Sequence, residues 1–238
     1  VGISYAGTNN FVSVDKLVIG VRYSAEKGEQ YQMLRVNGLP VNADEKGNYS
    51  EMDGASSSGE FVGSLSGIFS ASDRVTHKPL DTDVLLGRPC VVFSFELPLE
   101  ENKKEKYGSA LGYGSTASRE YAPIGKRGRV WIDRQNFRVL RFEFEATDIP
   151  RSFPIKAFES KTDYNWTEIN KVKYLLPANS DVRFTVSENG RVLQTRNEIR
   201  FRNYNKFDVN IKVLDDDEPV EEVKEEKPAP QKPEGQKP

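Results

Sequence analysis

Apolar and polar side chains alternate along much of this 238-residue chain. The alternation is most regular in four segments: residues 17–23, 91–97, 140–144 and 207–213. Successive side chains of a strand point to opposite faces, so each segment predicts a strand with one apolar and one largely polar face. This pattern is typical of antiparallel sheets with one face in water, and we therefore expect a mainly β fold.

Short turns separate the predicted strands. Asn189 and Gly190 both tolerate positive φ and indicate a hairpin, and residues 133–136 and 170–171 join two further strand pairs. About eleven strand segments follow one another in this way along the chain. We therefore predict an antiparallel sheet with the topology of a meander.

One segment, residues 59–70, has the spacing of a helix instead. Its apolar residues recur every three or four positions: Phe61, Val62, Leu65, Ile68 and Phe69. Ser57 and Glu60 match a capping box at its start. We expect one amphipathic helix packed on the concave face of a curved sheet, held there by packing because its glycines and serines lower helix propensity.

The last part of the chain differs in composition. Residues 215–238 contain nine acids, four lysines and five prolines but no aromatic residue. Such a segment cannot bury enough apolar area to offset the entropy of ordering. The sequence therefore predicts a single β-rich domain over residues 1–214 and a disordered acidic tail rich in Pro, Lys and Glu over residues 215–238.

The rare residues argue against several kinds of site. The chain has one cysteine, Cys90, and one histidine, His77, so it cannot form an intrachain disulfide, and a zinc site has too few nitrogen and sulfur ligands. We expect His77 in an exposed turn over residues 76–79 and Cys90 as a buried, inert thiol. We expect no metal, no cofactor and no catalytic residue.

The charge balance argues against nucleic-acid binding. The chain has 34 basic and 36 acidic side chains, for a net charge of -2. Basic residues gather between Lys126 and Arg141, but Asp133 and Glu143 are interleaved with them, which favours a solvated strand face. Glu143 and Glu145 share one face of a predicted strand, and we expect them to face water opposite basic residues of the next strand. A carboxylate-based hydrolase, which needs two acids in one cleft with one raised pKa, is the least favoured hypothesis.

Large apolar side chains are the strongest positive feature, with 13 Phe, 10 Tyr and 2 Trp. One short helix cannot cover the apolar face of a long sheet, which leaves a concavity suited to a lipid or an acyl chain. The alternative is that the sheet closes on itself and these residues are ordinary core. The candidate cavity residues are Phe61, Leu65, Phe69, Phe93, Phe95, Trp131, Phe142, Phe144 and Trp166.

Four segments carry a resemblance to a known superfamily. They are GRVWID at 128–133, RVLRFE at 138–143, LGRP at 86–89 before the strand at 90–97, and RNEIRFRNYNKF at 196–207. Over residues 80–214 the chain resembles the bacterial periplasmic lipoprotein-carrier and outer-membrane lipoprotein-sorting superfamily, in a secreted branch. The resemblance implies a sheet curled into a half-barrel around helices, an apolar cavity and no catalysis.

Two hypotheses follow for function. The first is a non-catalytic periplasmic or secreted bacterial protein that binds a lipid or an acylated protein in a cavity of the curved sheet and is peripheral to the membrane at most. The alternative is a structural or protein-interaction domain of the cell envelope, which would use its sheet edges or the acidic tail to bind an envelope protein. The chain begins Val1-Gly2-Ile3, and we expect a mature product whose signal peptide has been removed.

Overall fold

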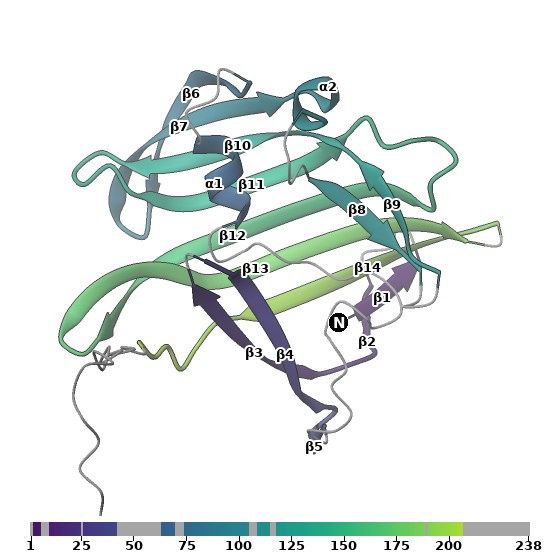
Figure 1. Ribbon diagram of the computed structural model, residues 1–238. Helices are drawn as coiled ribbons and strands as arrows, with labels where there is room; N and C mark the ends of the chain where they lie inside the picture. Colours follow the sequence, from purple (N-terminus) through teal and green to yellow (C-terminus); the bar gives the residue numbers. More distant parts are fainter. Residues whose placement is uncertain are drawn as a thin grey trace, which may run out of the picture. The chain divides into compact units, whose positions relative to one another are not determined.

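The computed structural model describes residues 2–5, 10–24, 26–41, 63–69, 74–104, 109–114, 118–188 and 190–206. These residues form fourteen strands and two short helices (Figure 1), which confirms the mainly β prediction with more strands than the eleven expected. Contacts divide the chain into two units, Val1–Asn205 and Lys206–Pro238, earlier than the boundary predicted at residue 214. The predicted strand at 207–213 and the predicted tail at 215–238 lie outside the described residues.

The strands begin and end as follows. They are β1 (Gly2–Tyr5), β2 (Val12–Ser13), β3 (Leu17–Ser24), β4 (Gly28–Val36), β5 (Leu39–Pro40), β6 (Thr76–Leu85), β7 (Arg88–Leu97), β8 (Ala110–Tyr113), β9 (Glu120–Pro123), β10 (Gly125–Asp133), β11 (Val139–Thr147), β12 (Ile155–Ile169), β13 (Val172–Glu188) and β14 (Arg191–Arg200). The helices are α1 (Gly63–Phe69) and α2 (Leu99–Asn102).

Nine strands form one antiparallel sheet in the order β2-β1-β14-β13-β12-β11-β10-β7-β6. From β10 to β14 each strand pairs with the next one in sequence, as a meander requires. The first described strand, β1, pairs with the last, β14, so the two lie side by side in the sheet. In the part of the chain that the structure describes, the sheet is open, with β2 and β6 at its edges.

Tight turns set the register of the long strands, as the sequence predicts. Asn170 and Lys171 both have positive φ, 51° and 64°, and connect Ile169 of β12 to its partner Val172 of β13. Two consecutive residues of positive φ match the twist of the flanking strands. Gly190, with φ 74°, serves the same purpose between β13 and β14.

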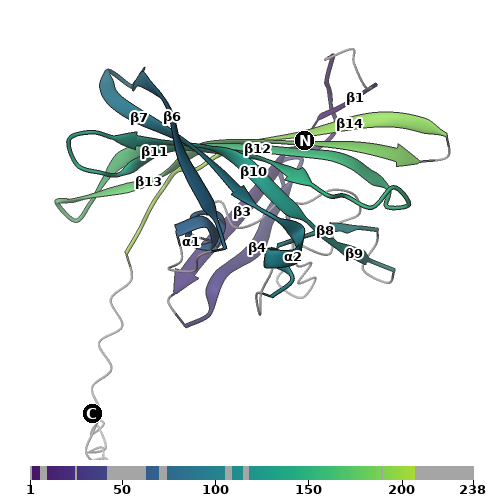
Figure 2. The ribbon, with the colours of Figure 1, turned by 90° about the horizontal axis from the view of Figure 1, so that it is seen from above.

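The two faces of the large sheet have different neighbours. Figure 2 shows α1, α2 and the β3–β4 and β8–β9 hairpins on one side of the sheet. We call this side the covered face. Phe95, Val130 and Phe142 lie on it, in one buried cluster with Ile68 of α1. The opposite side, which we call the open face, carries Arg127, whose partner across the strands is Glu145.

The helix α1 lies on the sheet as predicted, although residues 59–62 and 70 of the predicted helix are outside the described part. Ile68 is 1% exposed and packs into the cluster of the covered face. The first backbone N–H of α1, that of Gly63, donates to the carboxylate of Glu29 on β4 at 3.0 Å. Packing against the sheet and this bond to β4 hold a helix whose composition favours other conformations.

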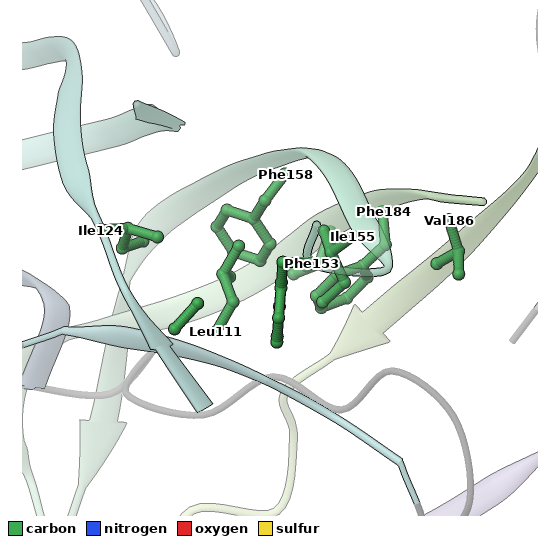
Figure 3. Close-up of a cluster of buried hydrophobic side chains, with 9 residues drawn as sticks. Leu111, Ile124, Phe153, Ile155, Phe158, Phe184 and Val186 are labelled. Carbon is green, nitrogen blue, oxygen red and sulfur yellow. The ribbon is translucent and has the colours of Figure 1, made fainter. Parts of the chain in front are cut away.

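A second buried cluster fills the other half of the covered face. It joins Ile155 and Phe158 of β12 and Phe184 of β13 to Leu111 and Ile124, which come from the β8–β9 hairpin and the residue after it (Figure 3). Phe144 and other half-buried side chains pack against this cluster. The β8–β9 hairpin thereby covers one end of the sheet, and α1 covers the other.

Candidate ligand-binding face

Five of the nine predicted cavity residues come together on the covered face. Phe95 and Phe142 are buried there, and Leu65, Phe93 and Phe144 pack against them. They belong to three elements far apart in sequence, namely α1, β7 and β11. The alternation of apolar residues along β7 and β11 is the signal that places these phenylalanines on a common side.

The phenylalanines form a continuous row across the sheet. Ring centroids are 5.3 Å apart between Phe95 and Phe142, 5.3 Å between Phe142 and Phe144, and 5.4 Å between Phe144 and Phe158. Phe184 extends the row with an edge-on contact at 5.0 Å to Phe158. We call these five residues the phenylalanine row. Each such ring pair contributes about 0.5–1.5 kcal/mol beyond its buried area.

Gly128 allows the row to cross β10. It lies opposite Phe95 of β7 and Phe144 of β11 in the register. A Cβ atom at this position would lie 2.0 Å from the backbone oxygen of Glu143 and 2.8 Å from the Cα of Phe144. The close approach of β11 therefore requires glycine.

The other predicted cavity residues lie elsewhere. Trp131 is on the open face, where its indole N–H donates to Asp83 at 2.9 Å and it packs with Cys90, Val92 and Leu140. Phe69 is 46% exposed, and its ring stacks on that of His77. Trp166, near the end of β12, is 39% exposed. Phe61 lies outside the described residues.

A lysine on the covered face is the residue that the sequence analysis missed. Lys126 is only 8% exposed, and its Nζ lies 4.7 Å from the ring centre of Phe144. Among the described residues, no hydrogen bond or ion pair involves its ammonium group. Burial lowers the pKa of Lys126 from the ordinary lysine value of 10.5 to about 8.

The sequence contains a signal for this burial. Lys126 has the parity of Gly128 and Val130, whose side of β10 faces the phenylalanine row, whereas Arg127 and Arg129 point to the open face. The expectation of a single solvated basic face is therefore correct for the arginines and wrong for Lys126. Its partners across the strands are Leu97 and Ala146, both apolar.

The open face carries a charged groove with a cavity volume of about 740 Å³. Its charged lining residues are Lys78, Arg127, Arg129, Lys161, Arg183, Glu96, Glu143, Glu145, Glu159 and Asp181. Basic and acidic side chains are equal in number, so the groove has no net charge. Arg127 pairs with Glu145 and Arg129 with Glu143, which confirms that these glutamates face basic residues of the neighbouring strand.

Several carboxylates are held in their ionised form by ion pairs or hydrogen bonds. Burial raises the pKa of Asp181, but hydrogen bonds and charge from Arg196 and Arg183 outweigh it and keep the pKa below the ordinary value. The fully buried Asp133 has the same balance, with Arg88 as its partner, and its pKa is also lowered. A hydrogen bond from Trp131 lowers the pKa of Asp83. Within the described ranges every carboxyl pKa with a resolved shift is lowered, the opposite of what a general acid requires.

The structure also shows where the single cysteine and the single histidine lie. Cys90 is fully buried, as predicted, and burial raises the pKa of its thiol. His77 lies in β6 and not in the predicted turn, and it stacks on Phe69 with ring centroids 5.8 Å apart. No group of three or more His, Cys, Asp or Glu side chains in the described part of the chain could hold a metal ion.

Neither helix of the described residues has the length and apolar character needed to cross a membrane. Searches against models of protein families, curated proteins and solved structures found no match to this chain.

Proposed function

We propose that this protein is a non-catalytic binding protein that holds a lipid or another apolar group against the covered face of its sheet. The observation that carries the proposal is the phenylalanine row, an apolar track that crosses several strands on one side of the sheet. Apolar binding sites are lined mainly by hydrophobic and aromatic side chains, with few polar groups. A charged group also lies next to the row: the ammonium of Lys126 contacts the ring of Phe144.

The thin cover at the α1 end supports this function. Of the seven residues of α1, only Ile68 is fully buried, and most of the others are glycine or serine. Burying one isoleucine side chain contributes about 1.5–3 kcal/mol. An apolar ligand of a few methylene groups, at about 0.8 kcal/mol each, therefore offsets the loss of this contact when α1 moves away.

The resemblance to the lipoprotein-carrier superfamily points in the same direction. In that architecture a curved sheet, or half-barrel, surrounds an apolar ligand site covered by helix, and the described sheet is open with α1 on one face. We accordingly propose a periplasmic or secreted location for the protein and a lipid or an acylated protein as its partner.

A dye-binding titration tests the proposal on the full chain. N-phenyl-1-naphthylamine, a neutral dye that fluoresces in apolar surroundings, should bind saturably, and native mass spectrometry should show co-purifying lipid. Ile68→Ala should strengthen dye binding because it loosens the cover, whereas Val84→Ala, at a residue 66% exposed on β6, should leave it unchanged. The absence of both saturable dye binding and bound lipid would refute the proposal.

The charged groove favours a second candidate, a protein-interaction domain of the cell envelope. An exposed groove with alternating charges suits a polar protein surface of complementary charge pattern. Cross-linking in extracts, followed by a pull-down, should then recover a specific partner that is lost in Glu143→Arg or on removal of residues 215–238. Unchanged recovery in both variants would exclude this candidate.

A further inference from the structure

The ammonium group of Lys126 lies among apolar side chains and has no counter-charge among the described residues. It is 8% exposed, and within the described part of the chain its one charge-related contact is with the ring of Phe144. A cation–π contact offsets only part of the cost of removing an ammonium group from water. Such a lysine lowers the stability of the ligand-free protein, and an anionic group bound at Nζ would offset part of this cost.

The neighbouring strands supply no acid to Lys126. Across β7 and β11 its partners are Leu97 and Ala146. The acids of those strands, Glu96, Glu143 and Glu145, line the groove on the open face, on the far side of the sheet. The acids of β7 and β11 therefore lie on the open face with the arginines, and Lys126 lies on the other face without an acid from either strand.

The position of this charge defines a ligand with two parts. The ammonium lies over Phe144, the central ring of the phenylalanine row, so an apolar chain along the row would bring a headgroup at its end to Nζ. A single lysine offers one positive charge and no planar fork of donors. A carboxylate matches it in charge, whereas a phosphate dianion would leave one negative charge buried without a partner.

We propose that Lys126 binds the carboxylate of a long-chain amphiphile, such as a fatty acid, whose tail lies along the phenylalanine row. This inference rests on the proposed function, since it names the class of ligand for the same face. A hydrogen bond between charged groups in an apolar site contributes on the order of a ten-fold to hundred-fold gain in affinity. The protein should therefore prefer an acid to an alcohol of equal chain length.

The test compares three ligands by displacement of N-phenyl-1-naphthylamine from the full chain: palmitate, 1-hexadecanol and hexadecyl phosphate. Wild type should bind palmitate at least about ten-fold more tightly than 1-hexadecanol. Lys126→Met should abolish this preference while keeping dye binding, and Lys126→Arg should keep part of the preference. Lys161→Met, which removes an exposed lysine of the open-face groove, is the matched control and should retain the wild-type preference.

The possible outcomes separate the inference from the proposed function. Dye binding with equal affinity for palmitate and 1-hexadecanol in wild type overturns the inference and leaves apolar binding in place. A preference that survives in Lys126→Met but is lost in Lys161→Met also overturns it, because the headgroup would then lie on the open face. Tightest binding of hexadecyl phosphate overturns the choice of carboxylate. Failure of the dye and of all three ligands to bind overturns both proposals.

Discussion

Replacement of Lys126 by methionine should stabilise the protein at neutral pH. Methionine has nearly the same length and fits an apolar site, so the substitution removes the buried charge without opening a cavity. A fall in pKa from 10.5 to about 8 corresponds to about 3 kcal/mol, since one pKa unit is worth about 1.4 kcal/mol. We therefore expect Lys126→Met to raise the free energy of unfolding at pH 7 by up to about 3 kcal/mol.

The pH dependence of this gain provides a sharper test. Above pH 8 the folded protein releases the proton of Lys126, while the unfolded chain keeps it up to about pH 10.5. The unfolded state then binds more protons, so the wild type gains stability as the pH rises through this range. The advantage of Lys126→Met should be greatest below pH 8 and should shrink towards pH 10.5.

Urea unfolding at pH 7 and pH 10, followed by circular dichroism, measures both effects. The difference between wild type and variant cancels the tyrosines and other lysines that titrate in the same range. Lys161→Met is the control, because this lysine is exposed on the open face and its loss should change stability little. A variant that is no more stable at pH 7, or whose advantage is the same at both pH values, would refute a buried ammonium at this position.

Three other substitutions test the sheet. Phe142→Ala, at a side chain only 1% exposed in the middle of the phenylalanine row, should lower the free energy of unfolding by about 3–5 kcal/mol; a loss below about 1 kcal/mol in urea unfolding would contradict the burial of this side chain. Gly128→Ala places a Cβ 2.0 Å from the Glu143 backbone oxygen and should weaken the β10–β11 pairing, seen as faster amide hydrogen exchange in β11. Unchanged protection would show that the pairing accommodates the methyl group and does not require glycine. Asp133 has a lowered pKa beside Arg88, so its contribution is present above the ordinary carboxyl value of about 4 and is lost as the pH falls through its folded pKa. Asp133→Asn should accordingly destabilise the protein at pH 6 and much less at pH 3, and an equal loss at both pH values would argue against this ion pair.

The sequence predicts the local structure of most strands because one face of each is apolar. The alternation in 91–97 and the turn at Asn170 and Lys171 correspond to β7 and to the β12–β13 connection. Pairing between distant strands leaves no such local signal, and the contact of β1 with β14 could not be predicted. The sequence also predicts a turn at the start of Thr76–Leu85, because proline is rare in strands. Pro79 is tolerated in β6 because this strand lies at an edge of the sheet.

In the candidate site, too, alternation within a strand could be predicted from the sequence, whereas the register between strands could not. Phe95 and Phe142 lie in one buried cluster, and each belongs to a run with clear alternation. Val130, Trp131 and Ile132 are all apolar, so their sequence does not show which of them faces which side. The register decides: Val130 lies opposite Phe93 and Phe142, and Trp131 lies opposite Val92 and Arg141.

The outer strand β6 has a consequence for self-association. A free sheet edge normally offers a row of unpaired N–H and C=O groups to which another chain can add. Here Pro79 has no N–H to offer, and the Asp81 and Asp83 carboxylates accept the N–H groups of Thr82 and Val84, both at 2.7 Å. Among the described residues, an incoming strand at this edge would find these donors occupied and would meet two negative charges, which disfavours the addition of a strand from another chain.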